Sequence, residues 1–177
     1  NWNRPKKEVD FLMNEAKKHY ESMIDSVTNL GYNVKIIGET IEDEEVNNKI
    51  IKLNNLGNKN ESFTVVFAFN YGSKKELVNA TKLICQNVVD KKISIENIDE
   101  ALIDNNLYTN GLPPIDFMIR TSGEYRISNF MLWQIAYAEL YFPKTYWPDF
   151  NRKELYKAIE NYQLRNRRFG KIGEEDD

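Results

Sequence analysis

A polar loop between residues 120 and 128 holds the side chains best suited to chemistry. It follows a short apolar run, Asp116–Ile119, and combines arginines with several hydroxyl groups and a glycine. Arg120 and Arg126 offer planar guanidinium groups that bind phosphate oxygens through parallel hydrogen bonds. Ser128 stands where the N-cap of a following helix is expected. Because free N–H groups and the positive end of a helix dipole also attract anions, the loop predicts a diphosphate site.

The elements that must position this loop lie on both sides of it. The stretch Asp116–Phe142 reads as strand, polar loop, helix and strand, with the apolar residues of the helix spaced from Phe130 to Ala136. A second interpretation of the arginines stays open. Arg120 and Arg126 are also spaced to form surface ion pairs with Glu124 and Glu139.

The rest of the chain alternates helical and extended patterns. We expect further helices over 5–30, 42–56, 73–88, 94–106 and 152–168, and strands over 33–37 and 63–69. The apolar run of the second strand predicts burial on both faces. Together these patterns predict an α/β fold with a largely parallel central sheet flanked by helices. We expect one domain over residues 1–170 and a disordered acidic tail over residues 171–177.

Composition excludes several classes of function. The 177 residues carry a net charge of −3, which gives no reason to expect nucleic acid as a partner. His19 is the only histidine, so metal sites built from several histidines and Ser-His-Asp catalysis are excluded. The single cysteine, Cys85, favours a reducing compartment. No signal peptide and no apolar run of about 20 residues occur, so we expect a cytoplasmic protein.

Asn70 opens a polar turn, Asn70–Ser73, directly after the second predicted strand. In parallel sheets, ligands bind beyond the carboxyl ends of the strands, so Asn70 is a candidate binding residue. A polar turn that only introduces the next helix explains the same residues equally well.

Residues Ile119–Glu139 and the later Trp147–Phe150 carry an extended signature. They resemble the cis-prenyltransferases, whose pattern is I-R-T-[SG]-G-E-x-R-[IL]-S-N-F-x-[LM]-W-Q-x-x-Y-x-E followed by W-P-D-F. The resemblance implies that Arg120, Arg126 and Ser128 hold the diphosphate of isopentenyl diphosphate and that Glu139 helps to bind Mg²⁺. The family often has histidine where this chain has Tyr125, which leaves no proton relay to expect there.

Both ends of the chain match further family motifs. Asn1, Arg4 and Glu8 fit N-W-x-R-P-x-x-E, which implies Asn1 near the reacting diphosphate, Arg4 in contact with it, and Glu8 in support. Arg168 and Gly170 fit an R-x-G motif that reaches into the partner's site across a dimer interface. Without the family, Asn1 is only a chain end, and Arg168 is a basic residue near the end of a helix.

Three apolar residues are candidates for the wall of a product tunnel. Phe63 corresponds to a family position near the closed end of the tunnel, where bulk limits product length. Phe67 and Met118 are expected to line the same wall. The plain alternative is that a phenylalanine on a strand belongs to the core. The Asn70 turn also matches the family's N-Y-G-[GS] segment.

The resemblance implies a defined activity. A family member joins isopentenyl diphosphate to an allylic diphosphate such as farnesyl diphosphate with Z geometry, using Mg²⁺. The product is a long polyprenyl diphosphate of the undecaprenyl or dolichol kind, which has to be delivered to a membrane, so peripheral contact with one is expected. The resemblance also implies a homodimer or a heterodimer with a related subunit.

One family segment, H-x-x-x-x-M-D-G-N-x-R-W, does not occur in the chain. In the family it binds the allylic diphosphate and supplies the main Mg²⁺ ligand, so we expect a longer protein and an inactive chain when these residues stand alone. Two alternatives stay open. One is a non-catalytic subunit that binds diphosphate and supports an active partner, and the other is an unrelated α/β domain for phosphorylated ligands.

Overall fold

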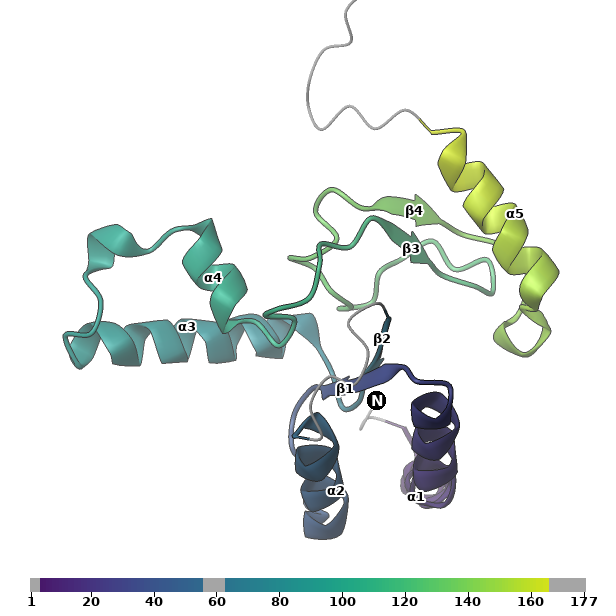
Figure 1. Cartoon of the computed structure of the whole chain (residues 1–177), viewed down its shortest axis with the longest axis horizontal. Helices are drawn as coiled ribbons and strands as arrows, with labels where there is room; N and C mark the ends of the chain where they lie inside the picture. The colour runs from purple at the N-terminus through teal and green to yellow at the C-terminus, as the bar shows by residue number, and fades with distance from the viewer. Residues whose placement is uncertain (1–3, 56–62, 166–177) are drawn as a thin grey trace, which may run out of the picture. The chain divides into compact units, whose positions relative to one another are not determined.

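A computed structural model describes residues 4–55 and 63–165, except the side chains of residues 16–21 and 23–28 (Figure 1). The chain forms two compact units, Asn1–Asn110 and Gly111–Asp177, and each is described by itself. Both units combine helices with parallel strands, which confirms the predicted α/β class. One domain over residues 1–170 stays a prediction, and the acidic tail lies outside the described residues.

The first unit begins with a helix followed by a β-α-β arrangement. Helix α1 spans Lys6–Asn29, strand β1 Asn33–Ile37, helix α2 Glu44–Asn54 and strand β2 Thr64–Ala68. The strands are parallel, with Asn33 opposite Thr64 and Ile37 opposite Ala68, and both helices contact β1 (Figure 1). All four elements lie where the sequence predicts them, with small shifts at their ends.

Local signals explain where these elements start and stop. The Asp43 carboxylate accepts a hydrogen bond from the Val46 amide at 3.2 Å and so caps α2. Gly38 ends β1 with a φ of 131°, and a Cβ atom placed there would lie 1.8 Å from the Phe69 carbonyl oxygen. Only glycine therefore allows the ends of β1 and β2 to approach so closely.

Asn54, at the end of α2, binds the edge of β1 that faces away from β2. Its side-chain oxygen accepts from the Ile36 amide at 2.8 Å, and its nitrogen donates to the Ile36 carbonyl at 2.9 Å. The amide thus replaces the hydrogen bonds of a neighbouring strand. Ile36 and Ile37 are buried, together with Val46 of α2.

β2 is less buried than predicted. Thr64 and Ala68 are exposed, and only the three residues between them are half-buried. The expectation of burial on both faces was wrong, because α1 and α2 pack mainly on β1, and no helix of the described residues packs comparably on β2. The faces of a parallel sheet are covered by packed helices.

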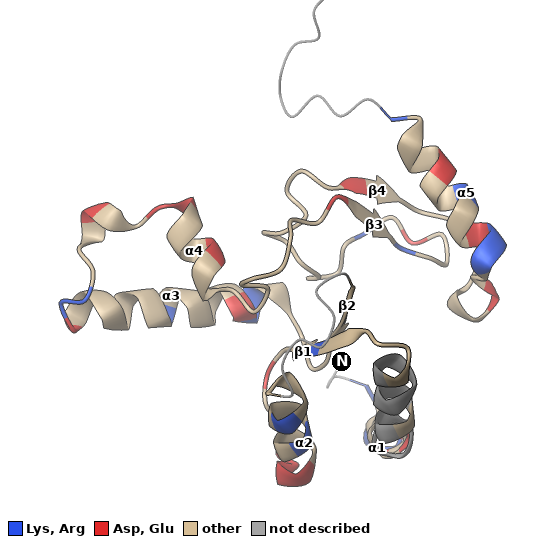
Figure 2. Cartoon of the chain, in the orientation of Figure 1, with Lys and Arg blue, Asp and Glu red and all other residues tan. Residues whose placement is uncertain are grey.

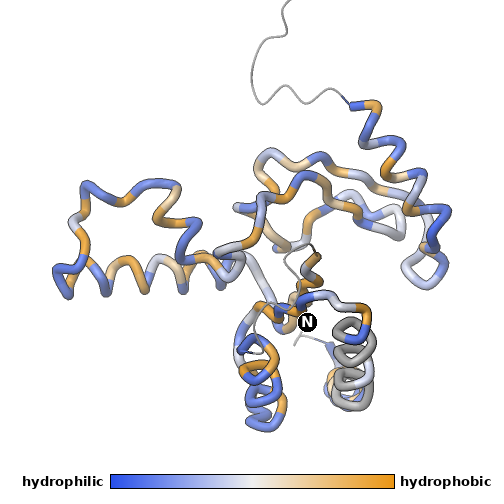
Figure 3. The backbone as a smooth tube through the Cα atoms, viewed as in Figure 1, coloured by the Kyte–Doolittle hydropathy of each residue, from blue (hydrophilic) through white to orange (hydrophobic). Residues whose placement is uncertain are grey.

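Helix α3, Ser73–Val89, follows the Asn70 turn as predicted. Hydrophobic and hydrophilic segments alternate along it (Figure 3), and its inward residues Ala80 and Ile84 are buried. The short helix α4, Glu100–Asn106, lies against α3. This pairing buries one face of α3.

Residues 94–106 do not form the single helix that we predicted. A 3-10 turn, η1 (Ile95–Asn97), precedes α4, and Ile98 between them has an extended backbone with ψ 108°. The Asp99 carboxylate accepts from the Leu102 amide at 2.7 Å. Asp99 therefore caps the α-helix, because the extended Ile98 interrupts the helical hydrogen bonds before it.

The second unit contains the parallel strands β3, Phe117–Ile119, and β4, Glu139–Tyr141. A 3-10 turn, η2 (Trp147–Asp149), leads to helix α5, Arg152–Gln163. Ala158 of α5 is fully buried, and the Tyr162 ring packs on Phe117 with 4.9 Å between ring centroids. These contacts hold α5 against β3.

The last helix is shorter than predicted. It ends at Gln163, with Leu164 as its C-cap, so the predicted continuation to residue 168 was wrong where the structure describes it. Ile159 of this helix is exposed. Ala158 and Tyr162, four residues apart, make its inward stripe.

No helix forms between Phe130 and Ala136, contrary to the prediction. The segment consists of hydrogen-bonded turns, such as the bond from the Ile135 amide to the Met131 carbonyl at 3.0 Å. Ser128, Asn129 and Met131 have positive φ values of 50°, 63° and 50°. Left-handed residues break a right-handed helix, so Ser128 does not act as a helix cap. Within residues 4–55 and 63–165, no helix has the length and apolar character needed to cross a bilayer.

Candidate active site

The loop of residues 120–128 leaves the end of β3 and is held against the chain that follows β4. The Arg120 amide donates to the Tyr141 carbonyl at 2.9 Å. Ser122 and Gly123 form a tight turn with φ values of 73° and 65°. Their amides donate to the carbonyls of Thr145 at 2.8 Å and Pro143 at 2.9 Å.

Because the amides of Arg120, Ser122 and Gly123 already have partners, these three are not available to an anion. The expectation of a helix dipole at this site is corrected, since no helix starts at Ser128. The glycine serves the turn. The arginine and hydroxyl side chains of the loop stay candidates for anion binding.

The two arginines of the loop lie close together. Arg120 Nη1 donates to the Arg126 carbonyl, and Arg126 Nη1 forms an ion pair with Glu124. The Arg126 side chain is 64% exposed, and Figure 2 shows basic and acidic segments together in this loop. The ion-pair interpretation is thus confirmed for Arg126 with Glu124. An exposed pair of this kind is weak and leaves the guanidinium available to a stronger ligand.

Glu139, the candidate metal ligand, is the first residue of β4 and pairs with Arg165. Arg165 Nη1 lies 2.7 Å from a Glu139 carboxylate oxygen and also donates to the Leu140 carbonyl at 2.9 Å. The alternative that paired Glu139 with Arg120 or Arg126 was wrong. Within the described residues, no group of three or more His, Cys, Asp or Glu side chains is arranged to hold a metal ion.

Arg4 and Glu8 lie at the start of α1 in the first unit. They form an ion pair one helical turn apart, with both side chains largely exposed. The Glu8 carboxylate thus holds one nitrogen of the Arg4 guanidinium. Asn1, Arg168 and Gly170 lie outside the described residues.

Asn70 lies where β2 ends and reaches across to the chain leaving β1. Its side-chain nitrogen donates to the carbonyls of Glu39 at 3.3 Å and Thr40 at 3.2 Å, and its φ is 48°. Asn70 therefore joins the carboxyl ends of the two strands. It does not cap α3, whose N-cap is Gly72.

A buried polar network lies next to Asn70, and sequence reasoning missed it. The Glu76 side chain is 1% exposed and accepts hydrogen bonds from the Tyr71 hydroxyl and from the Tyr108 amide at 2.8 Å. The Tyr108 hydroxyl donates to Glu39, and Asn79 donates to Glu39 at 2.6 Å. A buried carboxylate needs such partners, and these anchor the turn before α3.

The same network changes the acidity of Tyr108. Burial raises the pKa of its phenol to about 12, and the hydrogen bond to Glu39 adds to this effect while one from Asn79 opposes it. The phenol therefore stays protonated well above its usual range and keeps donating to Glu39.

The three candidate tunnel residues have different environments. Phe63 is 54% exposed and packs on Tyr32, with 4.7 Å between ring centroids. Phe67 is half-buried in β2 opposite Ile36, and Met118 is buried in β3 opposite Leu140. Phe63 is thus no core residue among the described parts of its unit.

Known proteins are similar to this chain over nearly its whole length. The family described as putative undecaprenyl diphosphate synthase matches residues 1–170. A ditrans,polycis-undecaprenyl-diphosphate synthase of Haemophilus influenzae, specific for (2E,6E)-farnesyl diphosphate, is 42% identical over 171 residues, 96% of this chain and 72% of that protein. An isoprenyl transferase of Streptococcus agalactiae is 41% identical over 177 residues, 97% of this chain and 71% of that protein.

Solved structures share the fold as well. A lavandulyl diphosphate synthase from Lavandula x intermedia, in complex with dimethylallyl diphosphate, superposes with a TM-score of 0.88 at 33% identity, over 96% of this chain and 74% of the other. A probable undecaprenyl diphosphate synthase from Campylobacter jejuni gives a TM-score of 0.81 at 30% identity, over 97% of this chain and 78% of the other. The chain therefore belongs to the undecaprenyl diphosphate synthase family, the cis-prenyltransferases that its arginine loop resembles.

Proposed function

We propose that the protein containing these residues condenses isopentenyl diphosphate with an allylic diphosphate, such as farnesyl diphosphate, repeatedly and with Z geometry. The product is a long polyprenyl diphosphate. The observation that carries the proposal is the loop of residues 120–128, where two arginines lie together on a turn fixed by backbone hydrogen bonds. Relatives at about 40% identity named as undecaprenyl diphosphate synthases support it.

In this proposal Arg120, Arg126 and Ser128 bind the diphosphate of isopentenyl diphosphate. Arg126 exchanges its exposed partner Glu124 for the ligand, because a diphosphate offers more charge and more acceptor oxygens than one carboxylate. Asn1, Arg4 and Glu8 act at the reacting diphosphate, and Asn70 contributes at the end of β2. Holding two reactants in place can lower a bimolecular barrier by up to about 7–11 kcal/mol.

Mg²⁺ fits the proposal through one carboxylate of this chain. Mg²⁺ commonly takes one or two protein carboxylates and completes its shell with waters and substrate phosphates. Glu139 supplies an oxygen for such a site once Arg165 releases it. The ion would neutralise charge on the departing diphosphate.

In this proposal, three apolar side chains line the space that holds the growing polyprenyl chain. Phe67 and Met118 form part of its wall, and the exposed ring of Phe63 limits the length of the product. Arg168 and Gly170 reach the partner's site in a homodimer or related heterodimer. A cytoplasmic location with peripheral contact to a membrane completes the proposal, since a long polyprenyl product has to reach a bilayer.

A non-catalytic subunit that supports an active partner is the second candidate. Such a subunit would bind diphosphate through the same arginine loop without turning over substrate. We propose that the 177 residues alone are inactive, because the segment that binds the allylic diphosphate in the family does not occur among them. The intact arginine loop favours catalysis in the whole protein.

The test is an assay of the full-length protein with labelled isopentenyl diphosphate, farnesyl diphosphate and Mg²⁺. We expect long products with new Z double bonds, identified by mass spectrometry and NMR, and none from the 177-residue chain. The non-catalytic subunit would be favoured instead if the full-length protein bound isopentenyl diphosphate but formed product only after an active relative was added.

A further inference from the structure

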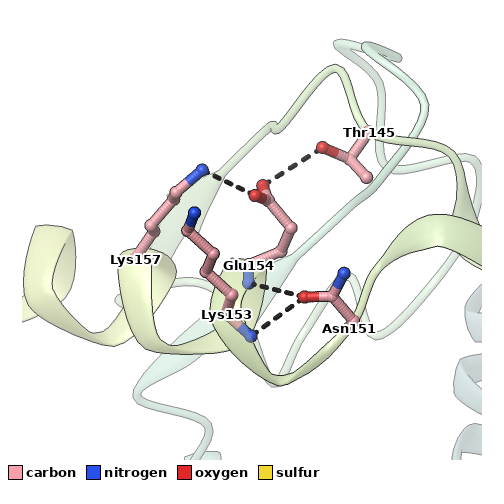
Figure 4. A network of polar contacts seen from close by, with 5 residues as sticks. All are labelled: Thr145, Asn151, Lys153, Glu154 and Lys157. Carbon is pink, nitrogen blue, oxygen red and sulfur yellow. Dashed lines mark hydrogen bonds and ion pairs between the residues drawn. The ribbon is translucent and has the colours of Figure 1, made fainter.

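A polar network joins the start of α5 to the chain that follows β4 (Figure 4). The Thr145 hydroxyl donates to one oxygen of the Glu154 carboxylate at 3.2 Å, and Lys157 donates to the other at 2.6 Å. Asn151 caps the helix by accepting from the amides of Lys153 at 3.0 Å and Glu154 at 3.4 Å. Glu154 is thereby held from both sides.

Thr145 also belongs to the support of the arginine loop. Its carbonyl accepts the Ser122 amide at 2.8 Å, next to the bond from the Gly123 amide to the Pro143 carbonyl at 2.9 Å. Ser122 and Gly123 form the turn between Arg120 and Arg126. One residue therefore touches the loop through its backbone and α5 through its side chain.

Helix α5, to which Thr145 is bonded, is itself held in place by packing within the second unit. Its Ala158 is fully buried, and the Tyr162 ring packs on Phe117 of β3. Beyond its end, Arg165 binds Glu139 and the Leu140 carbonyl. A group that is bonded to α5 is therefore held relative to β3 and β4.

We propose that Thr145 and Glu154 are positioning residues for the diphosphate loop, with Lys157 orienting the Glu154 carboxylate. The hydroxyl bond keeps residues 143–145 in place, and their carbonyls set the turn from which the arginines project. The functional part of this inference rests on the proposed binding of isopentenyl diphosphate.

An ordinary surface contact is the competing explanation. The Lys157 side chain is 52% exposed, so its ion pair alone stabilises little. The Glu154 side chain, at 20% exposure, is better shielded, and Thr145 is half-buried. The two explanations differ in what happens at the Ser122 and Gly123 amides, which lie in another part of the chain.

The test compares Thr145→Val, which removes only the hydroxyl, with Thr145→Ser, which keeps it, in the full-length protein. We expect hydrogen exchange at the Ser122 and Gly123 amides to become about three- to tenfold faster in the valine variant, as befits the loss of one hydrogen bond. The KM for isopentenyl diphosphate should rise by a similar factor, with kcat and the KM for farnesyl diphosphate unchanged. Serine should restore both values.

Two further variants complete the design. Glu154→Ala removes the acceptor of the Thr145 hydroxyl and should cause the same faster exchange and higher KM as Thr145→Val. It therefore allows the test to be made even if Thr145→Val does not fold. Ser94→Ala is the matched control, because Ser94 donates to the Glu96 carboxylate at 2.6 Å in the other unit. It should change neither quantity.

Unchanged exchange at both amides would overturn the positioning role, and so would faster exchange with unchanged affinity for isopentenyl diphosphate. If the proposed function is wrong, the wild-type protein will bind no isopentenyl diphosphate. The positioning role can still be tested in that case, by hydrogen exchange at the Ser122 and Gly123 amides and by titration of the variants with inorganic diphosphate.

Discussion

Arg165 and Glu139 join the end of α5 to the first residue of β4. The Arg165 Nη1 lies 2.7 Å from a Glu139 carboxylate oxygen, and the two side chains are 28% and 29% exposed. A pair that is partly shielded from water is screened less than one on the open surface. At the proposed metal site, Mg²⁺ would have to compete with this guanidinium for the carboxylate.

We predict that Glu139→Gln raises the Mg²⁺ concentration for half-maximal activity by about tenfold or more, because a neutral amide is a poor Mg²⁺ ligand. Glu160→Gln, an exposed change on α5, is the control and should leave the requirement unaltered. Activity measured against Mg²⁺ concentration checks this. An unchanged curve for Glu139→Gln would remove Glu139 from the metal site.

Replacing Arg126 tests the diphosphate loop directly. Hydrogen bonds to charged groups contribute about 1.5–3 kcal/mol, so Arg126→Met should raise the KM for isopentenyl diphosphate about 10- to 100-fold. Arg126→Lys should recover only part of this, since lysine lacks the planar fork. Steady-state kinetics provide the measurement, with Arg152→Met on the exposed start of α5 as control. Equal KM values for wild type and Arg126→Met would refute the assignment.

The Tyr108 network predicts a loss of stability at alkaline pH. The folded protein holds the Tyr108 proton up to a pKa of about 12, whereas the ordinary value is 10.0. Stability from this group is complete below pH 10.0 and declines as pH rises toward about 12, because the unfolded chain releases the proton first.

Denaturant unfolding of wild type and Tyr108→Phe on both sides of pH 10.0 measures this effect. The stability advantage of the wild type over the variant should be constant at lower pH and shrink in the alkaline range. Parallel pH profiles for the two proteins would mean that the phenol is not held in this way.

Gly38 and Gly111 can be compared for the loss of stability that an added Cβ atom causes. Both have positive φ values, 131° and 79°, but only at Gly38 would a Cβ atom strike backbone, 1.8 Å from the Phe69 oxygen. Gly111→Ala should cost about 1–2 kcal/mol of unfolding free energy from backbone strain. Gly38→Ala should cost at least about 3 kcal/mol, because β1 and β2 have to move apart. Chemical denaturation compares them, and equal losses would contradict the close approach.

Sequence patterns predicted the first elements of the first unit well, namely α1, β1, α2, β2 and α3. The periodic apolar residues of α1 and the apolar runs of β1 and β2 each signal their own structure. The same reasoning failed at Phe130–Ala136, because apolar spacing does not reveal the left-handed backbone of Ser128, Asn129 and Met131. Burial of β2 was overestimated, since its apolar run does not reveal which strand the helices will cover.

The arginine loop could be recognised from residue types and spacing, but its partners could not. Glu139 and Arg165 are separated by 26 positions, and Tyr108 and Glu39 by 69. No local pattern links such residues. Local sequence is enough to suggest the helix cap at Asn151 and the ion pair between Glu154 and Lys157, three residues apart. It does not indicate that Thr145 joins α5 to the arginine loop.

The side chain of Asn54 has a consequence for how this sheet is assembled. Because it occupies both the amide and the carbonyl of Ile36, the outer border of β1 is closed to another strand at its centre. A further strand beside β1 would first have to displace this side-chain amide from Ile36. The Asn54 side chain thus protects one side of the sheet from pairing with another chain.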